Sequence, residues 1–178
     1  SRDGYYSVIY TGAPAFDASE LDALWQPMIW QRKIFPTQSF VSLAFMCSMP
    51  ACMVEIKGKS MGVAAHPEEF PYQPLPSRNN NRFGVLLRDA SGKARPMLTA
   101  PVLGHEGSKM AAGAPFSFRI CLVAENRQVD YAYETVARNL YGFHDYRSNA
   151  ITTLNNTIDN LIDYTLSEYG CFPVSYTH

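Results

Sequence analysis

Apolar residues at helical spacing mark the C-terminal part of the chain. Across residues 148–169, a rotation of about 100° per residue gathers one set of side chains into a broad stripe: Ile151, Leu154, Ile158, Leu161, Ile162, Thr165, Leu166 and Tyr169. Asn155 falls inside the stripe, Ser148 stands where a helix would be capped, and Gly170 stands where it would end. We predict an amphipathic helix whose apolar face needs a partner, and we expect the chain to be a piece of a longer protein that supplies another helix.

Period-two alternation dominates the residues before that helix. Strands are predicted at 5–10, 40–46, 52–56, 60–65, 83–88, 97–103 and 116–123. Residues 57–59 and 90–93 are predicted turns, 15–24 a loop or short helical turn, and 67–81 a long ordered or semi-rigid loop rich in proline. Short strands about ten residues apart predict a mainly β fold, an antiparallel β-sandwich with C-terminal α-helices.

The hydrophobic period changes from two to 3.6 near Val129. Asp130 stands where it can cap a helix that carries Tyr133, Val136 and Leu140, and Gly142 stands where that helix would end. We therefore divide the chain into a β-sandwich domain (1–128), a linker helix (129–147) and the first helix of a truncated helical domain (148–178).

Charge and hydropathy narrow the possible partners. The 178 residues include 15 basic and 16 acidic residues without long runs, and the net charge is −1. The sequence therefore lacks the excess of basic residues that is typical of nucleic-acid binding. No stretch approaches the roughly 20 apolar residues of a membrane span. The first residues lack the pattern of a signal peptide, although such a signal can lie upstream.

Cysteine and histidine spacing gives no metal or redox motif. The cysteines at 47, 52, 121 and 171 have no C-x-x-C spacing. They are read as buried free thiols, and a Cys47–Cys52 disulfide across a turn is the alternative in an oxidising compartment. The histidines at 66, 105, 144 and 178 share no ligand spacing, so we expect neither a metal nor a cofactor.

Carboxylates and aromatic rings are the remaining candidates for chemistry. No nucleophile elbow, phosphate-binding loop, dinucleotide fingerprint or zinc-protease motif is present. Two carboxylates suffice for glycoside hydrolysis. The candidate pairs are Glu68 with Glu69 and Asp159 with Asp163. Asp159 and Asp163 are four residues apart, and such a pair normally forms the solvated edge of a helix.

Flat rings can stack on sugars, although most rings in such a chain fill the core or an interface. The aromatic candidates for carbohydrate binding are Trp25, Trp30 and Tyr72, with Phe35 and Tyr146 also available. Arg82 and Arg88 are candidates for ligand hydrogen bonds or for salt bridges at strand edges.

Several phrases of the sequence resemble a known family. Residues 25–30, 70–76, 81–89, 96–104 and 139–147 read WQPMIW, FPYQPLP, NRFGVLLRD, PMLTAPVLG and NLYGFHDYR. They resemble the N-terminal region of large secreted or periplasmic proteins from polysaccharide-degrading bacteria, in which a supersandwich-type β-sandwich precedes an (α/α)-barrel of the six-hairpin glycosidase type. The resemblance covers nearly the whole chain and carries no catalytic signature.

The resemblance implies an architecture and a supporting role. Residues 148–169 would be the first helix of the barrel, catalytic carboxylates would lie on the barrel, and the sandwich would buttress it and line part of its glycan cleft. We therefore expect a periplasmic or secreted, non-catalytic domain of a glycoside hydrolase, with the downstream helical domain as partner. A stand-alone carbohydrate-binding or adhesion module is the alternative, and a small enzyme that uses Asp159 and Asp163 is a third possibility.

Overall fold

The computed structural model describes residues 4–29, 34–69, 82–105, 107–144, 152–167 and 170. Contacts divide the chain into two compact units, Ser1–Phe143 and His144–His178, and each unit is described by itself. Among the described residues, no helix combines the length and the apolar character that crossing a bilayer requires.

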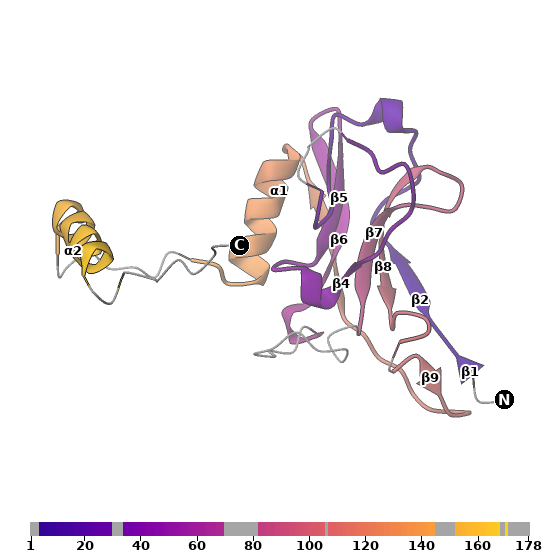
Figure 1. The fold of residues 1–178 in the computed structure, drawn as a ribbon. Coiled ribbons are helices and arrows are strands. Elements are labelled where there is room, and N and C mark those ends of the chain that lie inside the picture. The colour runs from indigo at the N-terminus through magenta and orange to yellow at the C-terminus, as the bar shows by residue number, and fades with distance from the viewer. Residues whose placement is uncertain are drawn as a thin grey trace, which may run out of the picture. The chain divides into compact units, whose positions relative to one another are not determined.

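Two antiparallel four-stranded sheets face each other in the first unit (Figure 1). The first sheet has the order β10–β6–β5–β3, formed by Ile120–Glu125, Lys59–Ala65, Ala51–Ile56 and Ala23–Trp25. The second has the order β2–β8–β7–β4, formed by Val8–Thr11, Ala94–Ala100, Gly84–Arg88 and Ser42–Leu43. A short ribbon pairs β1 (Gly4–Tyr5) with β9 (Lys109–Met110). The predicted mainly β, antiparallel, sandwich-like fold is confirmed.

The main core fills the space between the two sheets. Val54 and Val63 reach it from the first sheet, and Val85 and Leu98 reach it from the second. Alternate residues of each strand share one face, so this inward set explains the period-two pattern of the sequence. At Gly12 and Gly62 the sheets come so close that a Cβ on Gly12 would lie 2.2 Å from the Gly62 carbonyl carbon, and only glycine fits there.

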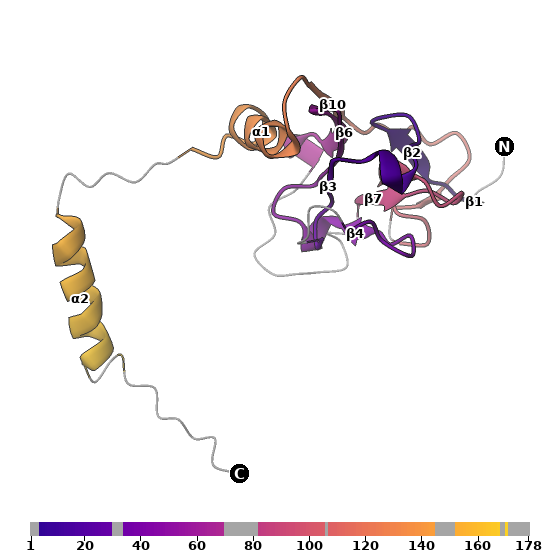
Figure 2. The same ribbon diagram turned by 90° about the horizontal axis from the view of Figure 1, so that it is seen from above.

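Helix α1 (Val129–Thr135) covers the outer face of the first sheet, as Figure 2 shows from above. Val129, Ala132 and Val136 pack on a second apolar cluster that includes Met53 of β5. The helix continues as a single π-helical turn, Val136–Leu140, and Gly142 follows at φ 67°. The helix at 129–141 therefore lies in the same compact unit as the sheets, Ser1–Phe143.

The start of α1 differs from the prediction because its cap comes from a distant strand. Gln128, not Asp130, is the N-cap residue, and its side chain makes no cap hydrogen bond. Instead the backbone N–H of Val129 donates to Oε2 of Glu55 in β5 at 2.9 Å. A carboxylate at a helix N-terminus satisfies an unpaired donor and interacts favourably with the helix dipole, so no local cap is needed.

Several strand boundaries also differ from the prediction. The expected strand at 40–46 is only two residues long, and a 3₁₀ helix at Ala44–Met46 follows it. Strand β8 begins three residues earlier than expected, and β10 begins at Ile120 rather than at residue 116. Strand β3 was not predicted, because three residues are too short to show a period.

Helix α2 (Leu154–Leu166) lies in the second unit. Its N-cap is Thr153, whose hydroxyl accepts a hydrogen bond from the Asn156 backbone N–H at 3.2 Å, and its C-cap is Ser167. The helix is therefore shorter at both ends than the predicted 148–169, and residues 148–151 lie outside the described residues. Its described apolar residues are exposed, with Leu161 61% exposed and Leu166 76% exposed, while Ile151 and Tyr169 of the predicted stripe lie outside the described residues.

Candidate functional site

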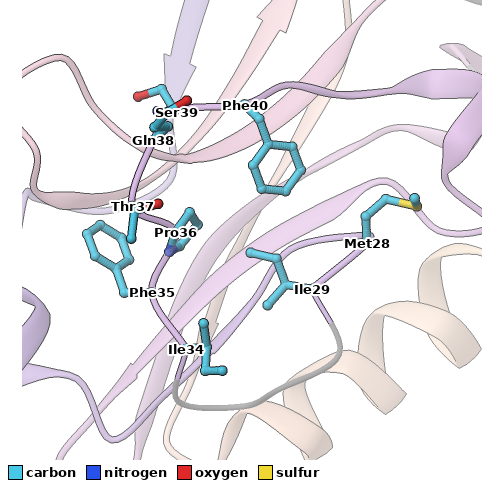
Figure 3. Close-up of a pocket in the computed structure, with 9 residues that line it drawn as sticks. All are labelled: Met28, Ile29, Ile34, Phe35, Pro36, Thr37, Gln38, Ser39 and Phe40. Atoms are coloured by element: carbon cyan, nitrogen blue, oxygen red, sulfur yellow. The ribbon is translucent and has the colours of Figure 1, made fainter.

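A pocket of about 610 Å³ lies where the chain passes from β3 to β4 (Figure 3). Its apolar lining consists of Met28, Ile29, Ile34, Phe35, Pro36 and Phe40, and its polar lining consists of Thr37, Gln38 and Ser39. Figure 3 shows the Phe40 ring beside the Ile29 side chain, with Thr37, Gln38 and Ser39 along one edge. The volume is in the range of roughly 300–1,000 Å³ that is typical of small-molecule sites.

The first wall is built on a tight turn. The Ile29 N–H donates to the Gln26 carbonyl oxygen at 3.0 Å, and this bond closes a turn with Pro27 and Met28 in the middle. Met28 has φ 76°, a conformation that such a turn normally gives to glycine. Backbone strain of this kind persists where the surrounding structure imposes it, and it concentrates at functional sites.

The second wall is held by Arg88 of β7. Its Nη1 donates to the Pro36 carbonyl oxygen at 3.1 Å, and its guanidinium carbon lies 5.0 Å from the centroid of the Phe35 ring. In return the Ser39 hydroxyl donates to the Arg88 carbonyl oxygen at 2.7 Å. Arg88 was a candidate for ligand binding or salt bridging, and in the structure it instead fixes the segment that forms this wall.

A buried amide ties both walls to the second sheet. Gln26 is 1% exposed, and its Nε2 lies 3.1 Å from the Phe40 carbonyl oxygen, 3.0 Å from the Ser42 Oγ and 3.3 Å from the Val85 carbonyl oxygen. The Ser42 hydroxyl in turn donates to the Pro27 carbonyl oxygen at 2.7 Å. These bonds connect the turn, the Phe40 backbone and β7, so one buried side chain holds both ends of the described lining in place.

The rim of the pocket keeps hydrogen-bonding capacity. The side chains of Thr37 and Gln38 make no hydrogen bond to other described residues. Every described residue that lines the pocket is uncharged. The arrangement therefore offers apolar and aromatic surface on its walls and neutral donors and acceptors at one edge.

The sequence-predicted aromatic residues lie in different places. Trp25 packs between sheet and helix, with its ring centroid 4.4 Å from that of Tyr133 in α1, and its indole N–H is buried without a partner in the described structure. This position favours a packing role. Trp30 and Tyr72 lie outside the described residues, although Trp30 directly follows the pocket residue Ile29 in sequence. Phe35 is the aromatic candidate that the structure places in the pocket.

The candidate carboxylates either form ion pairs within the fold or are exposed to solvent. Glu69 is 7% exposed, forms an ion pair with Arg82 at 2.9 Å and accepts a hydrogen bond from the Arg119 backbone N–H at 3.1 Å, while Glu68 pairs with the Arg119 guanidinium. These contacts join the 3₁₀ turn Pro67–Glu69 to Arg82, which precedes β7, and to Arg119, which precedes β10. Asp159 and Asp163 are exposed on α2. No carboxylate is among the described residues that line the pocket.

The described cysteines are free thiols and support no redox site. Cys47 and Cys52 are buried, and each donates a weak hydrogen bond to a backbone carbonyl, of Leu43 at 3.3 Å and of Leu86 at 3.4 Å. Burial raises the pKa of the Cys47 thiol to about 12 and raises that of Cys52 as well. Within the described ranges, no cluster of His, Cys, Asp and Glu is arranged to hold a metal ion.

Fold and pocket together define a two-sheet β domain with one helix-covered face and a hollow beside β4 whose described lining is uncharged. Comparisons with protein-family models, with curated proteins and with solved structures gave no match.

Proposed function

We propose that this chain is a non-catalytic β-sandwich domain of a multidomain carbohydrate-active protein, a glycoside hydrolase by the resemblance. The observation that carries the proposal is the contrast between its two units. The first unit has a buried core between its two sheets and a second buried cluster under α1, whereas α2 has no buried residue. An exposed apolar stripe on a helix is typical of a surface that packs against other helices.

The described carboxylates agree with a supporting role. A glycoside hydrolase needs an acid with a raised pKa and a second carboxylate several ångströms away across a cleft. Glu55 caps α1, and Glu69 is held between Arg82 and Arg119. The pKa of Asp89 is lowered, chiefly because its carboxylate accepts a hydrogen bond from the Ser91 hydroxyl in a hairpin turn. Each of these groups is used in the fold.

A helical domain downstream would supply both the catalytic carboxylates and the cover for α2, and export to the periplasm or the cell exterior follows from the same resemblance. The test compares the purified chain with the product of the complete reading frame on a panel of polysaccharides. We expect hydrolysis only from the complete product. Hydrolysis by the chain itself would overturn the proposal, and so would a reading frame that stops directly after codon 178.

A stand-alone glycan-binding module is the second candidate, and the pocket beside β4 favours it. It differs from the first in requiring no helical partner. The complete reading frame distinguishes the two proposals, because a stand-alone module does not need helical hairpins encoded downstream.

A further inference from the structure

Strand β2 forms one edge of the second sheet (Figure 1). It pairs with β8 on one side, and no described strand pairs with it on the other. The Gly12 N–H donates to the Pro96 carbonyl oxygen at 2.8 Å, and this bond sets the alternation of the antiparallel ladder. By that alternation and the register with β8, the backbone N–H and C=O groups of Ile9 and Thr11 point to the open side.

The side chains of β2 are exposed on both faces of the strand. Val8 is 43% exposed and Ile9 is 58% exposed, and successive residues of a strand point to opposite faces. Ile9 also lines a groove of about 630 Å³ on the outer face of the second sheet, together with Tyr5, Leu86 and Leu103. Apolar surface that gathers beside an open strand edge is typical of an interaction site.

The outer strands of the two sheets differ in their protection against pairing with another chain. Strands β3 and β4 are three and two residues long, and β10 lies between Arg119 and its own last residue, Glu125. Very short edges and charged side chains both discourage such pairing. Residues 4–16 contain no charged side chain, and residues 5–11 read YYSVIYT, which strongly favours a strand. Strand β2 therefore presents a four-residue edge without a charged neighbour.

From this edge we propose that β2 pairs antiparallel with β2 of a second copy of the chain, about a two-fold axis at Ile9. The strand is complementary to itself in this register. Ile9 faces Ile9 of the second copy and Val8 faces Tyr10 of the second copy, so apolar side chains meet on both faces of the joined sheet. An uncharged strand brings no like charges together across the axis. Both copies use the same patch, as a closed two-fold dimer requires.

The exposed area around the edge sets the strength of this dimer. The exposed apolar side chains together present on the order of 500 Å² of surface. They are Tyr5, Tyr6, Val8, Ile9 and Leu103. The backbone of β2 adds to this area, so each copy buries close to the about 600 Å² per partner that marks the lower limit of specific interfaces. We therefore expect a dimer that forms at high micromolar concentration and dissociates on dilution.

The test measures sedimentation of the full chain from about 5 to about 500 µM, and amide hydrogen exchange at both concentrations. We expect monomers at the low concentration, dimers at the high one, and amides of Ile9 and Thr11 that are protected only in the dimer. Ile9→Lys places two like charges opposite each other at the axis, so it should weaken the dimer at least about tenfold. Because Ile9 is exposed, the thermal stability of the monomer should hardly change.

Two matched variants carry the same charge to other exposed apolar residues. Leu122→Lys changes the edge strand β10, Leu161→Lys changes α2, and both should retain the dimer. A monomer at every concentration, or a dimer that Ile9→Lys weakens no more than either control does, would overturn the proposal. Protection of the Ile9 and Thr11 amides in the monomer would overturn it too, because another segment of the same chain would then cover the edge. None of these results bears on hydrolysis or on the reading frame, which test the proposed function separately.

Discussion

At the scale of single residues, Gln26 holds the pocket together. The two N–H groups of its Nε2 are shared among three oxygens within 3.3 Å, and the side chain is 1% exposed. Gln26→Ala leaves those acceptors unpaired, so we expect it to lower the free energy of unfolding by about 3 kcal/mol, measured in urea. Gln26→Glu should cost more, because a carboxylate would face two backbone carbonyl oxygens, which cannot donate, and a Ser42 hydroxyl that already donates to the Pro27 carbonyl.

Gln38→Ala is the control for Gln26, because Gln38 is exposed and makes no hydrogen bond to described residues. It should change the free energy of unfolding by no more than about 0.5 kcal/mol. Equal costs for Gln26→Ala and Gln38→Ala would show that the buried amide does not anchor the pocket.

Met28 carries a backbone penalty that glycine would avoid. Its φ of 76° costs a residue with a Cβ on the order of 1 kcal/mol, which glycine does not pay. Met28→Gly and Met28→Ala both remove the side chain, but only alanine keeps the strain. We expect the glycine variant to unfold at a higher urea concentration than the alanine variant, by a free-energy difference of about 1 kcal/mol. The reverse order would mean that the turn imposes no strain.

The buried thiols predict that stability falls at alkaline pH. Burial raises the pKa of Cys47 from 9.0 to about 12 in the folded chain, and it raises the pKa of Cys52 and Tyr141 too. Between pH 9 and about 12 the unfolded chain therefore releases thiol protons that the folded chain retains, and stability is lost as the pH rises. Each buried thiol contributes a slope of up to about 1.4 kcal/mol per pH unit.

Urea unfolding from pH 8 to pH 11 measures this slope. Cys47→Ala should reduce it, whereas Ser48→Ala should not, because Ser48 is exposed and does not titrate in this range. An unchanged slope in Cys47→Ala would contradict the assignment of Cys47 as a buried neutral thiol.

Residue-level roles were only partly predictable from the sequence. The reading of Cys47 and Cys52 as buried free thiols is confirmed, because small apolar neighbours already indicated burial. The pocket was not predicted. It depends on Gln26 and Arg88, whose partners lie as far as 59 and 52 residues away in the chain. Phe35 was named only as one ring among several, and no local pattern distinguishes it.

At the scale of elements, the docking of α1 depends on Glu55. This carboxylate is 3% exposed, and it accepts a hydrogen bond from the first residue of the helix. Glu55→Ala leaves that N–H buried, so we expect a loss of about 2–3 kcal/mol, with a smaller loss for Glu55→Gln, which keeps an acceptor. Urea unfolding, followed by the fluorescence of Trp25, measures this loss of stability, because Trp25 contacts Tyr133 of α1.

Glu134→Ala is the control on the same helix. Glu134 is exposed, and it forms an ion pair with Arg138 one turn away. Removing that pair should cost no more than about 0.5 kcal/mol. If Glu134→Ala proved as costly as Glu55→Ala, the buried cap would not be what holds α1 on the sheet.

Elements with strong local signals were predicted well. The hairpin of β5 and β6 matches the expectation, because alternation on both strands meets the Lys57–Gly58 turn with φ of 51° and 69°. The segment at 40–46 alternates equally well but bends after Leu43, because Ser42 is tied to Gln26 and Pro27. The N-cap of α1 was misplaced because Glu55 supplies the cap from another element.

At the scale of the whole molecule, the sequence predicted the class of fold and the presence of an exposed apolar helix. The mainly β architecture follows from the spacing of the strands. The structure has both the β fold and an exposed apolar helix. What the stripe of α2 packs against could not be read from the pattern, because periodicity records that a face is apolar and says nothing of its partner. The proposal that it opens a helical domain comes from the resemblance.

Amide hydrogen exchange in α2 tests this central claim most directly. A helix of 13 residues with an open apolar stripe is marginal in water, so in the chain alone its amides should exchange rapidly while those of β5 and β6 remain protected. In the product of the complete reading frame the same α2 amides should be protected to the level of a packed helix. Slow exchange of α2 in the chain alone, or equally rapid exchange in both proteins, would contradict the account.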